Sequence, residues 1–291
     1  MTVSATPRSS DAVRLSDLVV WKAQGRVVVM VTAYDFSTAG IVEAAGVDVV
    51  LVGDSAANVV LGYPSTVPVT VDELLVLVAA VRRGLSRALL VADLPFGSYE
   101  ISDAQAVATA IRFVKQGGAD AVKLERGGTS VDRAAAIVAA GIPVMGHVGL
   151  TPQTAVALGG LRAQGRRAVD AVAIVADGVA LQAAGCFSVV AEAVPAPVAA
   201  HLARCLAIPV IGIGSGVDVD GQVLVFHDLV GLSAEPVPRF VRRYAHAGDV
   251  LRAAVCSYAR DVRHRRFPTD THTYPITPDE LTTFQQAVHD R

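Results

Sequence analysis

The chain has 291 residues, enough for one large domain or two small ones. It is 52% hydrophobic, and its 25 basic residues nearly balance its 27 acidic residues, so the formal net charge is −2. This balance gives no electrostatic basis for binding nucleic acid or an anionic membrane surface. No apolar run reaches the roughly 20 residues that a membrane span requires, because Gly, Asp or Arg interrupts each one.

The first ten residues lack the apolar core of a secretory signal. We expect residues 1–14 to form a short disordered lead. The three cysteines, Cys186, Cys205 and Cys256, are widely spaced and include no CxxC pair, which is typical of reduced thiols in the cytosol. These features predict a cytoplasmic protein.

A repeated unit organises the chain between residues 43 and 214. In each copy a helical stretch ends in Gly or small residues, and a β-branched run follows at once. This order is typical of the helix-to-strand turn in a parallel α/β fold. The copies begin at Glu43, Lys115, Val138, Gln182 and Cys205.

Together with the flanking apolar runs, the repeat predicts eight strands. Their near-continuous apolar character indicates burial on both faces. Eight such strands in a chain of this length favour a (β/α)₈ barrel, the TIM barrel. An open doubly wound sheet is the alternative, because the number of strands does not by itself force closure. The strands are expected near residues 27–32, 48–53, 88–93, 120–125, 142–147, 187–192, 209–213 and 223–227.

The gap between the seventh and eighth strands, residues 214–223, is too short for a full helix. After strand eight we expect residues 238–265 to be helical, followed by a last helix near the C-terminus. No linker rich in Gly, Ser or charge is present, so residues 15–291 are predicted to form a single barrel domain with a C-terminal helical extension. Capping boxes mark three helix starts, at Thr70–Glu73, Ser102–Gln105 and Thr277–Glu280.

Acidic side chains follow several predicted strands at the point where each strand ends. In a parallel barrel these carboxyl ends meet at one face, where active sites lie. Carboxylates gathered there repel one another and are costly to desolvate unless a cation neutralises them. Two Asp and one Glu form a hard, all-oxygen set that suits Mg²⁺. The residues expected at this face are Asp35, Asp54, Asp93, Glu125, His147, Glu192 and the loop Gly212–Gly216.

Each of these residues also has a simpler interpretation. An Asp before a helix can merely cap that helix. Lys123 shares one side of its strand with Glu125 and needs an anion, which is either a neighbouring acid or a substrate carboxylate. His147 is either a hydrogen-bonded core residue or catalytic. The glycines of Gly212–Gly216 either cradle a phosphate or permit a tight turn.

Nine blocks of the chain resemble the ketopantoate hydroxymethyltransferase family. They occur in order between about residues 15 and 270 and are specific in combination. The family is a (β/α)₈ barrel in the superfamily of phosphoenolpyruvate mutase and isocitrate lyase, and is commonly a decamer. The blocks are Val31–Asp35, Val52–Ser55, Ser65–Thr70, Ala92–Phe96, Val122–Glu125, Gly146–Gln153, Gln164–Arg166, Ile208–Gly214 and Asp220–Asp228.

The resemblance implies a homo-oligomeric, Mg²⁺-dependent enzyme of pantothenate and coenzyme A biosynthesis. Such an enzyme moves a one-carbon unit from 5,10-methylenetetrahydrofolate to the 2-oxo acid 3-methyl-2-oxobutanoate through a Mg-stabilised enolate, giving 2-dehydropantoate. Carried over by position, Asp54, Asp93 and Glu125 match the metal-binding acids. Asp54, Ser55, Asp93 and Lys123 match the residues that bind the 2-oxo acid, Glu192 matches the proton acceptor, and His147 is a candidate for orienting a ligand.

Three departures from the family pattern concern substrate choice. Pro64 stands where the family usually has an acid, Arg126 separates Glu125 from the two glycines that normally follow it, and the stretch 234–240 is longer than usual. A related enzyme for another 2-oxo acid, or a superfamily lyase or mutase using the same enolate, is therefore the alternative. A lyase would be favoured by a Cys after the fourth strand, and residues 127–133 contain none.

Two further alternatives are a phosphate-sugar barrel enzyme, which would leave three acids unexplained, and a catalytically inactive barrel. The four intact acids argue against an inactive barrel. No motif in the chain localises the folate.

Overall fold

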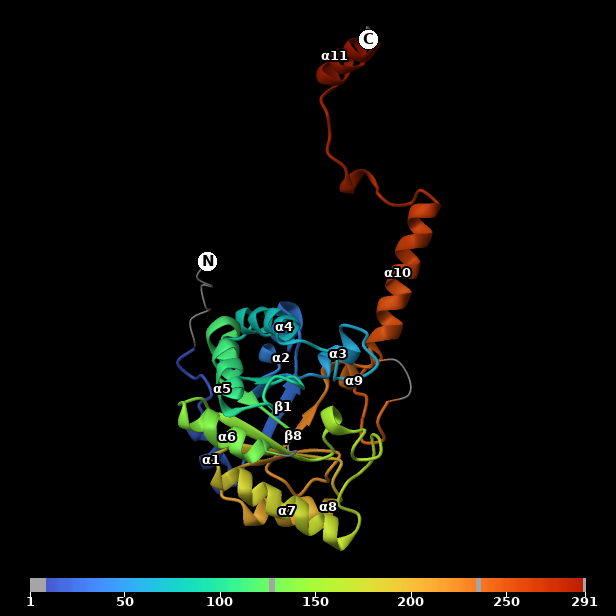
Figure 1. Ribbon diagram of the computed structural model, residues 1–291. Helices are drawn as coiled ribbons and strands as arrows, with labels where there is room; N and C mark the ends of the chain where they lie inside the picture. Colours follow the sequence, from blue (N-terminus) through green and yellow to red (C-terminus); the bar gives the residue numbers. More distant parts are fainter. Residues whose placement is uncertain (1–8, 126–128, 234–236, 290–291) are drawn as a thin grey trace. The chain divides into compact units, whose positions relative to one another are not determined.

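The strands close into a barrel. The computed structural model describes residues 9–125, 129–233 and 237–289. Eight parallel strands pair in chain order, and β1 (Val28–Thr32) pairs with β8 (Gly221–Leu224) to complete the circle. Helices surround the strands on the outside (Figure 1). The (β/α)₈ barrel predicted from the repeat is confirmed, and the open sheet is excluded.

The remaining elements alternate as the repeat predicts. The other strands are β2 (Val49–Val52), β3 (Leu89–Asp93), β4 (Ala121–Lys123), β5 (Val144–Gly149), β6 (Ser188–Glu192) and β7 (Val210–Ile213). The helices of the barrel are α1 (Leu15–Gln24), α2 (Phe36–Ala44), α3 (Ala56–Val59), α4 (Val71–Arg83), α5 (Asp103–Arg112) with the π-turn Phe113–Gly117, α6 (Ser130–Ala139), the 3₁₀ turn Pro152–Thr154, α7 (Ala168–Ala183), α8 (Ala196–Cys205) and α9 (Phe226–Val230).

Strand eight differs most from its predicted position. It begins at Gly221, and the expected residues 225–227 instead lead into α9. A Cβ at position 221 would lie 2.6 Å from Ile211 Cδ1 and 2.7 Å from the backbone oxygen of Val28, so only Gly fits between these strands. Local pattern alone argues against a strand that begins with glycine, because glycine weakens strands. Here the close approach of the neighbouring strands requires glycine, so the strand begins at Gly221. As expected, no helix lies between β7 and β8.

The N-terminal segment contacts the barrel from residue 9 onward, earlier in the sequence than predicted. The backbone N–H of Ser9 donates to the oxygen of Ser86, the N–H of Val13 donates to the oxygen of Arg87, and the Val13 side chain is buried. The expectation of disorder is therefore wrong for residues 9–14, and residues 1–8 lie outside the described part of the chain.

Two capping boxes can be compared with their predictions. Thr70 and Glu73 cap α4 reciprocally, as expected. At α5 the Ser102 hydroxyl accepts from the backbone N–H of Gln105, but the Gln105 side chain accepts from Ile101 instead of Ser102. The second site is a helix cap without a full capping box.

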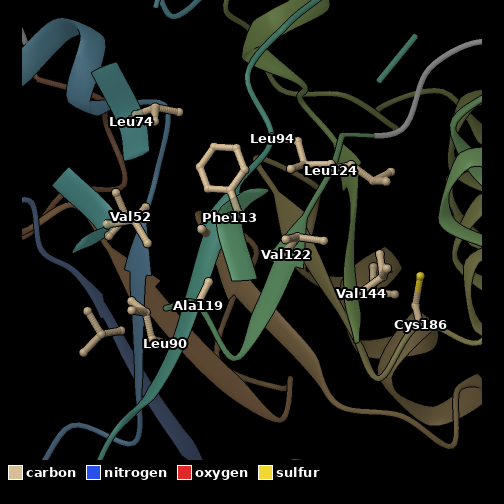
Figure 2. Packing of buried hydrophobic residues seen from close by; sticks show 14 of the residues in the cluster. Val52, Leu74, Leu90, Leu94, Phe113, Ala119, Val122, Leu124, Val144 and Cys186 are labelled. Atoms are coloured by element: carbon tan, nitrogen blue, oxygen red, sulfur yellow. The ribbon is translucent and has the colours of Figure 1, made fainter. Parts of the chain in front are cut away.

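Alternating strand residues create two hydrophobic layers. One layer fills the barrel interior and includes Val49 and Leu51, while the other lies between the strands and the helices and includes Val50 and Val52. Figure 2 shows part of the outer layer, where Phe113 packs among side chains from the strands and α4. Successive strand residues point to opposite faces, so any residue two positions after an interior one points inward again.

This alternation brings polar residues to the mouth of the barrel. Val91, Ala121, Met145 and Val190 belong to the interior layer. The residues two positions further on therefore point into the carboxyl end of the barrel, and each strand thereby delivers one functional group to the same space. These residues are Asp93, Lys123, His147 and Glu192.

Residues 245–291 form a second compact unit. It contains α10 (Ala247–Arg263), a 3₁₀ turn (Asp270–His272) and α11 (Pro278–His289), and none of their residues is buried. The helix expected over 238–265 begins nine residues late, because Phe240 packs onto the interior layer and the N–H of Tyr244 donates to the oxygen of Leu229. In the described part of the chain, no helix has both the length and the apolar character needed to cross a bilayer.

Gly149 is predicted to be the least replaceable residue of β5. Its φ is +92°, and an added Cβ would overlap the backbone oxygen of Glu192 and lie 2.5 Å from Val194 Cγ2. We expect Gly149→Ala to lower the free energy of unfolding by about 2–4 kcal/mol, from left-handed strain plus overpacking. Urea denaturation measures this loss.

Gly141→Ala is the matched control, because its φ is +85° and no atom lies within 4 Å of the added Cβ. It should show the strain alone, about 1–2 kcal/mol. Equal losses in the two variants would contradict a role for the contact with Glu192.

Candidate active site

The candidate site is a cavity of about 1560 Å³ at the carboxyl ends of the strands. Its lining contains every residue carried over from the family resemblance, namely Asp54, Ser55, Asp93, Lys123, Glu125, His147 and Glu192. The loop Gly214–Gly216 also lines it. The structure therefore brings these separate strand ends together in one space.

Asp35 is the predicted residue that lies outside this set. Its Oδ1 accepts from the backbone N–H of Thr38 at 2.8 Å, and it caps α2. The simpler interpretation, a helix cap, is correct for this acid.

Asp93 and Lys123 form a buried ion pair. The register of β3 and β4 places the two residues side by side, and Lys123 Nζ lies 2.6 Å from Asp93 Oδ1. The second oxygen, Oδ2, accepts from the backbone N–H of Asp54 at 3.0 Å. Burial opposes the charged ammonium, but Asp93, Asp54 and Glu125 outweigh it and raise the pKa of Lys123 above its ordinary value. Lys123 therefore stays charged while facing the cavity.

Gln153 connects the acids, and the sequence analysis did not single it out. Its Nε2 donates to Asp54 Oδ2 at 2.9 Å and to the oxygen of Leu94 at 3.0 Å. Its Oε1 accepts from the Tyr99 hydroxyl at 2.6 Å, and its backbone N–H donates to Glu125 Oε2 at 3.0 Å. One buried residue thus fixes two carboxylates from two different strands. The sequence offered only its place within the Gly146–Gln153 block.

His147 lies between two carboxylates. Its Nδ1 is 3.6 Å from Glu125 Oε1, and its Nε2 is 3.4 Å from Glu192 Oε2. Neither nitrogen has a hydrogen-bond partner among the described residues, although both are buried. Burial and the positive charge of Lys123 hold the pKa of His147 well below its usual range. The imidazole is therefore neutral, with one N–H available for a ligand or a neighbouring acid.

The Ser55 hydroxyl is held by a hydrogen bond with the Tyr34 hydroxyl. The two hydroxyl oxygens are 2.8 Å apart, and Tyr34 is buried. An added Cβ at Gly53 would lie 2.8 Å from Ser55 Oγ, so glycine leaves room for this hydroxyl at the end of β2. The result is a serine hydroxyl fixed beside Asp54 at the cavity wall.

The loop after β7 is a turn held by side-chain contacts. Gly214 and Gly216 have positive φ, and the buried Ser215 hydroxyl donates to the oxygen of Ala191 and accepts from the N–H of Val194. These bonds occupy Ser215 within the protein. They favour the tight-turn interpretation over a phosphate cradle.

Burial perturbs three carboxyl groups of the cavity. It raises the pKa of Asp54 to about 7, with repulsion from Asp93 adding to the shift, and it also raises the pKa of Glu192 to about 7 against the opposing effect of Lys123. For Glu125, burial and the charge of Asp54 raise the pKa well above its usual range. The single positive charge of Lys123 does not balance the negative charges that these carboxyl groups carry when ionised.

The donor set fits a hard cation that keeps several of its own waters. No three His, Cys, Asp or Glu side chains in the described ranges converge closely enough to enclose an ion by themselves. Both oxygens of Asp93 accept hydrogen bonds, whereas Asp54 Oδ1 accepts none from the described residues. Mg²⁺ is held by one or two carboxylates and completes its octahedron with water and substrate oxygens, so Asp54 and its neighbours suit it.

The chain matches the family model described as ketopantoate hydroxymethyltransferase over residues 12–270. The 3-methyl-2-oxobutanoate hydroxymethyltransferase of Rhodococcus jostii is 54% identical over 261 residues, 90% of each chain. The protein of the same description from Acidothermus cellulolyticus is 55% identical over 262 residues, 90% of this chain and 96% of the relative.

Solved structures share the fold. Phosphonopyruvate hydrolase, in a complex with oxalate and Mg²⁺, has a TM-score of 0.59 at 15% identity and covers 96% of this chain and 97% of its own. The 2,3-dimethylmalate lyase of the phosphoenolpyruvate mutase/isocitrate lyase superfamily has a TM-score of 0.55 at 14% identity, covering 95% of each chain. The barrel type expected from the sequence is confirmed.

Gln153→Leu should destabilise the protein, because it leaves the buried Tyr99 hydroxyl and one Asp54 oxygen without a partner. We expect the free energy of unfolding to fall by about 2–4 kcal/mol. Adding Tyr99→Phe should recover part of the loss, since it removes one unsatisfied group. Gln105→Leu, which breaks similar bonds at an outer helix end, is the control and should cost at most about 1 kcal/mol. Equal losses at positions 153 and 105 would contradict the linking role.

The raised pKa of Asp54 predicts a pH dependence of stability in metal-free protein. The folded state binds more protons than the unfolded state between the ordinary pKa, 3.8, and about 7, so stability falls as pH rises through that window. The slope from one such group is at most about 1.4 kcal/mol per pH unit. Urea unfolding in chelator at about pH 5, 6 and 7 should show a shallower decline for Asp54→Asn than for wild type. Parallel profiles would refute the assignment.

Proposed function

Because the chain belongs to the ketopantoate hydroxymethyltransferase family, we propose that it transfers a hydroxymethyl unit from 5,10-methylenetetrahydrofolate to 3-methyl-2-oxobutanoate, giving 2-dehydropantoate. The observation that carries the proposal is the convergence of Asp54, Asp93, Lys123 and Glu192 on one cavity. Relatives that are 54% and 55% identical over nine-tenths of this chain bear the name of this activity.

The proposed metal is Mg²⁺, held by Asp54 and Asp93, with Glu125 as the third acid. The carboxyl groups are hard oxygen donors, and a cation relieves the repulsion that contributes to the raised pKa of Asp54. The oxalate and Mg²⁺ bound by phosphonopyruvate hydrolase add support, because oxalate and a 2-oxo acid present similar pairs of oxygens. When bound, the metal supplies Lewis-acid stabilisation of negative charge on the keto oxygen.

Lys123 and Ser55 are proposed to hold the 2-oxo acid. The Lys123 ammonium is charged, is buried from bulk solvent and lines the cavity beside Asp93. It therefore attracts the substrate carboxylate. The Ser55 hydroxyl, fixed by Tyr34, donates to the same ligand. Together they orient the branched end of the substrate, which includes C3, toward Glu192.

Glu192 is the proposed base. It projects from the end of β6 into the same cavity, with His147 between it and Glu125, and its side chain is 17% exposed. The pKa of about 7 that burial gives Glu192 suits a group that accepts a proton near neutral pH. It takes the proton from C3 of the 2-oxo acid, and that carbon then bonds to the methylene carbon of the donor. Both bonds from this methylene carbon to the folate nitrogens break in the overall reaction, water supplies the hydroxyl group of the product, and tetrahydrofolate leaves. His147, with its Nε2 3.4 Å from Glu192 Oε2 and no hydrogen-bond partner among the described residues, is the candidate for orienting a ligand beside this base.

Three departures from the family pattern bear on substrate choice. Pro64 lines the cavity, where it removes a carboxylate and a backbone donor. Arg126 and part of the stretch 234–240 lie outside the described residues. A different branched 2-oxo acid is the alternative substrate, and a homo-oligomeric assembly in the cytoplasm completes the proposal.

Proton exchange tests the proposal without the folate. With Mg²⁺ and 3-methyl-2-oxobutanoate in D₂O, NMR should show loss of the C3 proton signal. Glu192→Gln should slow this exchange by about 100- to 10,000-fold, because a positioned base contributes that much. Glu43→Gln is a control for the loss of a glutamate charge, since Glu43 binds the backbone of Ser86 and Arg87 far from the cavity lining.

Exchange that also requires added Mg²⁺ would support the metal assignment. Exchange on pyruvate or oxaloacetate, with none on the branched acid, would sink the hydroxymethyltransferase proposal and favour a superfamily lyase. Full exchange in Glu192→Gln would transfer the role of base to another residue.

A further inference from the structure

The cavity is larger than the 2-oxo acid requires. At about 1560 Å³ it exceeds the roughly 300–1,000 Å³ of most small-molecule sites. A five-carbon acid held by Lys123 and Ser55 occupies only the floor. The rest of the lining comes from the segments after β5, β6, β7 and β8 and from residues 58–66 after β2, and its chemistry indicates what binds there.

Charge is separated between the two parts of the cavity. The acids Asp54, Asp93 and Glu125 come from the ends of β2, β3 and β4. Arg162 and Arg166 come from the segment between β5 and α7, and Arg239 follows α9. The acid floor and the arginine rim therefore lie on segments from opposite halves of the barrel sequence.

The rim arginines are not engaged by acids of the protein. No ion pair joins Arg162, Arg166 or Arg239 to any described residue, and Arg162 Nε donates to a backbone oxygen, that of Leu158. By contrast, the adjacent Arg167 pairs with Asp170 at 3.0 Å. Asp228 also lines the cavity, but it is buried and its Oδ1 accepts from the Ser233 hydroxyl.

We propose that Arg162, Arg166 and Arg239 bind the glutamate carboxylates of the one-carbon donor. This inference rests on the proposed function, which requires a donor with a flat ring system at one end and an anionic tail at the other. Guanidinium groups bind carboxylates through paired, charge-assisted hydrogen bonds and keep their charge at any physiological pH. Three such groups on one rim match a tail that carries several carboxylates.

The same charge separation sets the direction of binding. Carboxylates of the tail are repelled by the acid floor and attracted to the rim. The ring end, which carries the one-carbon unit, is thereby directed toward Glu192 and the 2-oxo acid. Apolar side chains in the same lining, Leu161, Val194 and Phe240, provide contact surface for the rings. Phe240 is fixed there by Gly214, where an added Cβ would lie 2.6 Å from Phe240 Cδ1.

The test separates tail binding from chemistry at the floor. The variant carries Arg162→Gln, Arg166→Gln and Arg239→Gln, with each single variant measured as well. We expect the KM for methylenetetrahydrofolate with several glutamates to rise by about tenfold or more, because at least one charge-assisted contact is lost. The advantage of the polyglutamate donor over the monoglutamate donor should disappear. Mg²⁺-dependent C3 exchange of 3-methyl-2-oxobutanoate should stay at the wild-type rate.

Arg167→Gln is the matched control, an adjacent arginine that pairs with Asp170 and does not line the cavity. An unchanged KM in the triple variant, or an equal rise in Arg167→Gln, overturns the inference. Binding of tetrahydrofolate, followed by fluorescence without the 2-oxo acid, distinguishes the two proposals. If wild type lacks C3 exchange but binds the polyglutamate through these arginines, the proposed function fails and the rim assignment stands.

Discussion

The excess of buried negative charge at the mouth of the barrel is the constraint on which the site depends. Five carboxyl groups line one cavity, those of Asp54, Asp93, Glu125, Glu192 and Asp228, and among the described residues Lys123 is the one buried cation beside them. Burial raises the pKa of Asp54 and Glu192 to about 7 and that of Glu125 further, so the folded protein carries these groups at a cost in stability. The proposed Mg²⁺ would relieve that cost and so couple metal binding to folding.

The protein limits this cost by fixing Asp54, Glu125 and Asp93 through hydrogen bonds. Gln153 holds Asp54 and Glu125 at once, and Lys123 holds Asp93. The same contacts preorganise the carboxylates, because their positions are set before any ligand arrives. No described residue forms a hydrogen bond with the Glu192 carboxylate, and the neutral His147 lies beside it, with Nε2 3.4 Å from Oε2. The acid with the fewest constraints is the one proposed to move a proton.

In the proposed reaction, the two halves of the barrel bind different ligands. Strands β2 to β4 provide the acids and the lysine for the metal and the 2-oxo acid. The segments after β5 and α9 provide arginines for an anionic tail, and β6 places Glu192 between them. One continuous cavity thus binds two substrates whose reacting carbons meet near Glu192. Binding of two substrates in one cavity accounts for both its large volume and the opposite charges of the side chains at its two ends.

The sequence by itself determined the barrel and most of its site. Near-continuous apolar runs and the glycines after helices predicted eight strands, and the ends of these strands predicted that Asp54, Asp93, Glu125 and Glu192 meet at one face. Local pattern could not assign Asp35 to a helix cap, place the start of β8 at Gly221, or identify Gln153 and the unpaired arginines. Those depend on which groups meet across the closed barrel, where contacts join residues far apart in the chain. Asp54 and Gln153 are 99 residues apart and share one hydrogen bond, and only the tertiary structure could decide that.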